Sequence, residues 1–173
     1  MMKYNNESYN ILVNKLNIIG RYAHEMNMEL SRYRDIVEHY LTDKQVTCRL
    51  DIIATEKIIE QKKEMMKDNI DIYYDICKIL RYPNIMSYDD FNPEFSEGNN
   101  ELPKNFDVGL IEIYDRLLTR AMLEALPKNN QVSVSLDISV TERELTIKKE
   151  LIKFGSEHYF DILHSEGIPT ILS

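Results

Sequence analysis

Glycine and proline are scarce in this chain, with five of each among 173 residues, and tryptophan is absent. So few glycines argue against a glycine-rich phosphate-binding loop. No apolar run approaches the roughly 18 residues that a membrane-spanning helix needs, and the first residues lack the layout of a signal peptide. We therefore expect a compact, helix-rich protein that is cytoplasmic and does not contact a membrane.

Cysteine and histidine are too few and too scattered to indicate a catalytic or metal site. Cys48 and Cys77 lie in different predicted elements without a CxxC spacing, which predicts free, buried thiols. Asp161 and His164 have the spacing of a two-residue metal ligand, yet their counterpart in the first half of the chain lacks the histidine. No HExxH motif and no Ser, His and Asp set can be assembled. We expect no enzyme activity, no cofactor and no metal.

Half of the net charge of −8 lies in one segment. Residues 83–104 carry one basic and five acidic side chains, together with three of the five prolines and a Gly-Asn-Asn run. This composition is typical of a linker. It divides the chain into a first repeat, residues 1–82, and a second repeat, residues 105–173.

The two parts of the chain resemble each other at a constant offset of 86 residues. The identities span a segment of alternating polarity and the helical pattern that follows it. This long ungapped match predicts an internal duplication. The aligned pairs include Leu50-Asp51-Ile52 with Leu136-Asp137-Ile138, Thr55-Glu56 with Thr141-Glu142, Lys62-Lys63-Glu64 with Lys148-Lys149-Glu150, and Tyr73 with Tyr159.

Each repeat is predicted to contain a helix, a short strand and two further helices. Apolar residues at helical spacing predict first helices within residues 1–41 and 105–126. Residues 45–53 and 131–139 then alternate apolar and polar side chains, which is the period of a β-strand. Their β-branched and hydroxyl side chains also disfavour a helix. We expect a mainly α fold with two short strands, an internally duplicated α-β-α-α repeat whose strands pair as a pseudo-two-fold ribbon.

The helices after each strand have predictable ends. Ser139 or Thr141 is expected to cap the helix that follows the second strand, with Lys148 and Lys149 on its outer face. Breaks are expected at residues 67–69 and 154–156, and the apolar pattern resumes after each of them.

A strand of alternating polarity followed by helix, turn and helix resembles the ribbon-helix-helix family of DNA-binding proteins. The residues that carry this resemblance are 46–52 and 132–138, each with two helices after it. The resemblance implies that the strands pair antiparallel and that their polar face enters the major groove. It also implies contacts with bases from Thr47, Arg49, Ser133 and Ser135, and contacts with phosphates at the helix starts Asn69 and Ser156.

Two features depart from that family. Asp51 and Asp137 fall on the polar face of the predicted ribbon, and the chain as a whole is acidic, so both oppose binding to phosphates. Reading the same segments as part of a helix-turn-helix motif is less consistent, because Lys57 and Arg143 fall where a buried residue is needed.

Two functions therefore remain open. The first is a transcriptional regulator, or a plasmid or phage accessory factor, that binds double-stranded DNA through the tandem ribbon. The second is an acidic protein-binding module, such as an inhibitor, immunity or adaptor protein. In that case a basic partner would face Asp89, Asp90, Glu94 and Glu97.

Overall fold

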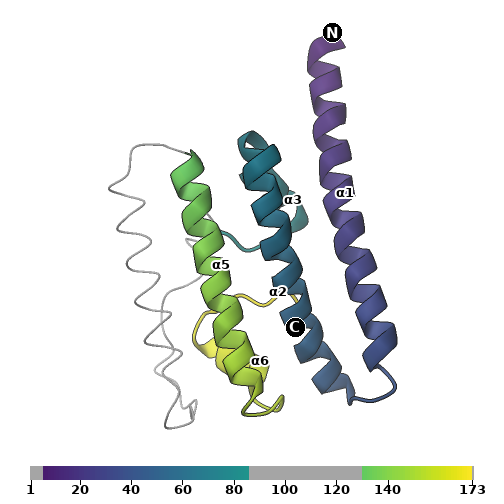
Figure 1. Cartoon of the computed structure of the whole chain (residues 1–173), viewed down its shortest axis with the longest axis vertical. Helices are drawn as coiled ribbons and strands as arrows, with labels where there is room; N and C mark the ends of the chain where they lie inside the picture. The colour runs from purple at the N-terminus through teal and green to yellow at the C-terminus, as the bar shows by residue number, and fades with distance from the viewer. Residues whose placement is uncertain (1–5, 86–129, 173) are drawn as a thin grey trace.

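The computed structural model describes residues 6–85 and 130–172, so the predicted helix at 105–126 and most of the acidic linker lie outside the described residues. The described helices are α1 (Asn6–Val37), α2 (Asp43–Asp68), α3 (Tyr73–Leu80), α5 (Asn130–Ile152) and α6 (Tyr159–Ser165), with a short 3₁₀ helix at Ile70–Ile72 (Figure 1). None of these helices is long and apolar enough to cross a membrane.

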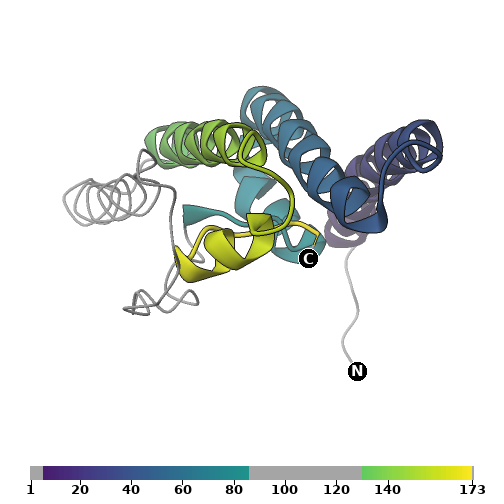
Figure 2. The same ribbon diagram turned by 90° about the horizontal axis from the view of Figure 1, so that it is seen from below.

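The helices form two layers (Figure 2). Helices α5, α2 and α1 lie side by side in one layer, and α3 and α6 pack against the same side of it. Helix α2 runs antiparallel to α1 on one flank and to α5 on the other. Because α2 has neighbours on both flanks and in the second layer, it is the central helix of the fold.

The prediction of two strands is wrong. Residues 45–53 lie inside α2 and residues 131–139 inside α5, so the described part of the chain contains no ribbon. In residues 45–53 all four alternating apolar residues are buried, with Cys48 and Ile52 on one side of α2 and Val46 and Leu50 on another. A helix buried on two faces has apolar residues beyond a single stripe, and over nine residues this pattern resembles the alternation of a strand.

The hydroxyl side chains that disfavoured a helix find their partners within it. The hydroxyl of Thr47 donates to the backbone carbonyl of Asp43 at 2.8 Å, and that of Ser139 donates to the carbonyl of Ser135 at 3.0 Å. Thr141 bonds in the same way to the carbonyl four residues before it. Such bonds let serine and threonine remain in a helix. The predicted capping role of Ser139 and Thr141 is therefore wrong, because both residues lie well inside α5.

The predicted breaks do end helices. Helix α2 ends at Asp68, and α5 ends shortly before Gly155, whose φ of 114° favours glycine. Thr42 is the N-cap of α2. It forms a capping box with Gln45, in which the Gln45 backbone N–H donates to the Thr42 hydroxyl at 3.3 Å and the Thr42 N–H donates to the Gln45 side chain at 3.1 Å.

Candidate functional site

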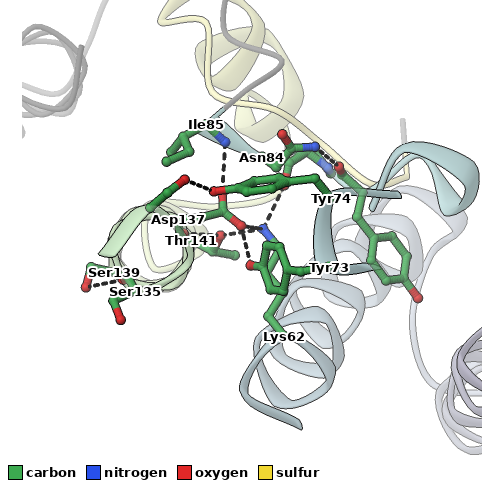
Figure 3. A network of polar contacts seen from close by, with 12 residues as sticks. Lys62, Tyr73, Tyr74, Asn84, Ile85, Ser135, Asp137, Ser139 and Thr141 are labelled. Atoms are coloured by element: carbon green, nitrogen blue, oxygen red, sulfur yellow. Dashed lines mark hydrogen bonds and ion pairs between the residues drawn. The ribbon is translucent and has the colours of Figure 1, made fainter. Parts of the chain in front are cut away.

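A fully buried ion pair joins α2 to α5 (Figure 3). The Lys62 Nζ lies 2.8 Å from Oδ2 of Asp137, and the two side chains are 0% and 1% exposed. The hydroxyl of Tyr73 on α3 donates to the same carboxylate, and the backbone N–H of Ile85 donates to its other oxygen at 2.8 Å. Lys62 also donates to the hydroxyl of Thr141 at 2.9 Å. The carboxylate and the ammonium group are thus both hydrogen-bonded to several partners.

A second network has the same composition. The Lys148 Nζ lies 3.1 Å from Oδ2 of Asp51 and donates to the hydroxyl of Thr55 at 2.9 Å. The Tyr159 hydroxyl donates to Asp51 at 2.6 Å, and the backbone N–H of Ile171 donates to the other carboxylate oxygen at 2.7 Å. Lys148, which was predicted to lie on an outer face, is therefore buried.

The offset of 86 residues relates each member of one network to a member of the other. In each network the lysine and the tyrosine come from one repeat, while the aspartate and the threonine come from the other. The backbone donors Ile85 and Ile171 are also 86 residues apart, and Ile85 lies three residues beyond the end assigned to the first repeat. Two further ion pairs, both on the surface, also join the repeats in this reciprocal way. They are Lys63 with Glu142 at 3.8 Å and Lys149 with Glu56 at 3.2 Å. Such reciprocity is what an internal duplication predicts, and it makes the two repeats an isologous pair within one chain.

The networks are suited to pairing the repeats rather than to a reaction. Burial, together with the neighbouring Asp137 carboxylate, raises the pKa of Tyr73, and burial beside Asp51 raises the pKa of Tyr159. Both phenols therefore stay protonated and act as donors. The tyrosine, lysine and aspartate side chains are at most 1% exposed, so a substrate has no access to them. Any shift of α5 along α2 would leave buried charges unpaired, which fixes the register of the two helices.

The predicted DNA contacts on α2 and α5 do not form one surface. Thr47 and Arg49 lie in the first turns of α2, and Ser133 and Ser135 lie in the first turns of α5. Because the two helices are antiparallel, these pairs lie at opposite ends of the layer (Figure 1). Ser133 shares a hydrogen bond with the Tyr74 hydroxyl, which holds it against α3.

Asn69 and Ser156, the residues predicted to contact phosphates, do not lie on one common face either. Asn69 follows the end of α2, and its side-chain amide donates to the hydroxyl of Tyr22 at 3.3 Å. Ser156 lies between α5 and α6, and its carbonyl accepts a hydrogen bond from Cys48 Sγ at 3.6 Å. Both residues are half-buried, and each serves a contact within the fold.

Both cysteines are free and buried, as predicted. Burial raises the pKa of Cys48 to about 11 and that of Cys77 to about 12, so both are protonated thiols at neutral pH. Within the described ranges, no three His, Cys, Asp or Glu side chains are grouped in a way that could hold a metal ion.

An exposed apolar row runs along the N-terminal part of α1. Tyr9, Leu12 and Leu16 are 58%, 49% and 54% exposed, and we call these three residues the α1 stripe. At the same heptad spacing the row continues into Ile19 and Met26, which are 5% and 7% exposed and belong to the core shared with α2 and α3. Figure 1 shows that the N-terminal part of α1 extends beyond the ends of the neighbouring helices. The stripe therefore lies where the described neighbouring helices no longer pack against α1.

Comparisons with protein-family models, with curated proteins and with solved structures find no match to this chain.

Proposed function

We propose that this protein is a protein-binding module of the adaptor or inhibitor type, in which the α1 stripe binds an apolar helix face of a partner. The observation that carries the proposal is the continuity of one apolar row along α1. Its C-terminal part packs into the core, and its N-terminal part is also apolar at the same spacing but is covered by no other described part of the chain.

The packing of α1 against α2 and α3 supplies the rigidity that such a binding surface needs. Lys15, beside the stripe, forms an ion pair with Asp75 on α3 at 2.6 Å, and Arg21 pairs with Glu64 on α2 at 3.0 Å. These contacts, with the buried Ile19, hold the base of the exposed part of α1. A preformed helix loses little conformational freedom when it binds, and this favours affinity.

The stripe itself indicates the chemistry of the partner. The other side of the same segment carries Asn10, Asn14 and Asn17, and the only charged side chains among residues 6–17 are Glu7 and Lys15. A surface with so few charges selects its partner by apolar fit, as in helix packing by heptad positions. The acidic residues that were assigned to a basic partner, residues 89–97, lie outside the described part of the chain, and the proposal does not depend on them.

DNA binding through a tandem ribbon is not retained. The surface expected to contact DNA bases required residues 45–53 and 131–139 to be strands, and these segments are helical. Its six contact residues are divided between the two ends of the helix layer, so they offer no continuous surface to one groove.

Photo-crosslinking in the native cell tests the proposal. A benzophenone amino acid is introduced at Leu12 in one variant, at Leu16 in a second and at Asn14 in a control variant. We expect the same protein adduct from the two stripe positions and none from Asn14, because that side chain projects from the opposite side of α1. An adduct of two copies of this chain would identify the partner as the protein itself. Equal adducts at all three positions, or none at the stripe, would contradict the proposal.

A further inference from the structure

A hollow with a volume of about 290 Å³ opens between α1, α2 and α5, at the end of the layer opposite to the α1 stripe. Its less polar lining residues are Ile52 and Ile53 from α2, Ile152 from α5 and Tyr33 from α1. This volume lies at the lower limit of typical small-molecule sites, so the hollow suits a small ligand.

The rim of the hollow is mostly cationic. It contains Arg49, Lys149 and Lys153, with Glu56 as the one acidic side chain of the lining. Lys149 is paired with Glu56 at 3.2 Å, and Lys153 is paired with Glu150 at 2.9 Å. Arg49 is exposed and makes no ion pair with any described residue. Its guanidinium group is therefore available to an anion at the edge of an apolar wall.

The internal duplication allows the residues around the hollow to be compared with their counterparts in the second repeat. At the other end of the layer, the positions equivalent to Arg49 and Ile53 are Ser135 and Ser139, both visible in Figure 3 on the outer side of α5. The two buried networks retain the same residue types in both repeats, whereas these positions around the hollow do not. The cation and part of the apolar wall thus belong to one repeat alone, so they are not a requirement of the shared fold.

We propose that the hollow binds a small aliphatic carboxylate. The hydrocarbon chain would lie against Ile52, Ile53 and Ile152, and the carboxylate would accept hydrogen bonds from the Arg49 guanidinium. Arginine suits this ligand because its planar group can donate two parallel hydrogen bonds to a carboxylate. Lys149 and Lys153 add positive charge on the α5 side of the hollow. This site is independent of the α1 stripe and of the proposed protein partner.

Methyl NMR of the full chain, with isoleucine methyl groups labelled and assigned by Ile→Val substitution, tests this site with octanoate as the probe. Octylammonium has a tail of the same length with the opposite charge, and acetate has the carboxylate without the tail. We expect octanoate to shift the methyl signals of Ile52, Ile53 and Ile152 but not that of Ile138, the counterpart of Ile52 at the other end. We expect the protein to bind octanoate at least ten times more tightly than octylammonium or acetate.

Two variants at Arg49 and one control variant at Lys63 locate the charge that is responsible. Arg49→Ala is expected to weaken octanoate at least fivefold, while Arg49→Lys retains part of the affinity. Lys63→Ala, which changes the counterpart of Lys149 at the far end, should leave binding within twofold of the original. The proposal is overturned if octanoate causes no shift at these methyl groups, if octylammonium shifts them equally, or if Arg49→Ala has no effect.

Discussion

Replacing Asp137 with alanine removes the carboxylate that three buried donors share. These are the Lys62 ammonium group, the Tyr73 hydroxyl and the backbone N–H of Ile85. Breaking a buried ion pair from one side costs about 3–5 kcal/mol, and each unsatisfied buried donor costs about 1–3 kcal/mol. Because these costs overlap, we expect a loss of about 4–6 kcal/mol in the free energy of unfolding. A loss of this size would unfold many domains of marginal stability.

Urea unfolding followed by circular dichroism measures this loss. Adding Lys62→Met to the Asp137→Ala chain removes the unpaired charge and is expected to restore about 2 kcal/mol. The matched control is Asp75→Ala, which breaks the ion pair with Lys15. Those side chains are 31% (Lys15) and 51% (Asp75) exposed, so the expected cost is below about 1 kcal/mol. If Asp137→Ala costs no more than this control, or if the second substitution restores nothing, the buried network does not have the role assigned to it.

Three further predictions concern the two network tyrosines, the Cys48 thiol and the start of α2. Tyr73→Phe and Tyr159→Phe should each lower the free energy of unfolding by about 1–2 kcal/mol in urea titrations, because each hydroxyl donates to a buried carboxylate, and unequal losses would argue against equivalent networks. Burial raises the pKa of Cys48 from 9.0 to about 11. The stability gained by burying the neutral thiol should therefore be complete below pH 9 and be lost as the pH rises through 11, which urea unfolding at several pH values measures. Thr42→Ala should cost about 1 kcal/mol in thermal unfolding through loss of the α2 capping box, and an unchanged stability would contradict this.

The sequence predicted the helical content, the breaks after α2 and α5 and the free buried thiols, because these follow from local patterns. It also revealed the offset of 86 residues, which correctly pairs every member of the two networks. Local pattern failed where a helix is buried on more than one side. In residues 45–53 the alternating residues Val46, Cys48, Leu50 and Ile52 are all buried, so two sides of one helix produce the period of a strand. In residues 131–139 the same alternation includes Val132, which is 36% exposed, so the apolar pattern there does not follow burial.

The buried networks left a signal in the sequence that a strand interpretation concealed. Asp51, Thr55 and Lys62 are spaced by four and then seven residues, which places them on one face of a helix, and the second repeat has the same three residue types at the same spacing. On a strand, the aspartate falls on the polar face, and this is why the strand interpretation places Asp51 and Asp137 toward DNA.

The α1 stripe could be predicted as an apolar helix face but not as an exposed one. Exposure depends on where the neighbouring helices end, and α1 has 32 residues whereas α2 has 26. At about 1.5 Å per residue, this difference makes α1 roughly 9 Å longer. Only the three-dimensional arrangement locates the end at which that extra length emerges.

The most direct test of the proposed function is the affinity of the purified chain for the partner identified by crosslinking. The comparison is between the native chain, Leu12→Asp/Leu16→Asp and the control Asn10→Asp/Asn17→Asp, which adds the same charge to the other side of α1. Burying a leucine side chain contributes about 1.5–3 kcal/mol, so the stripe variant should bind about 100-fold more weakly or worse, while the control stays within about threefold. Equal affinities for the two variants would contradict the account.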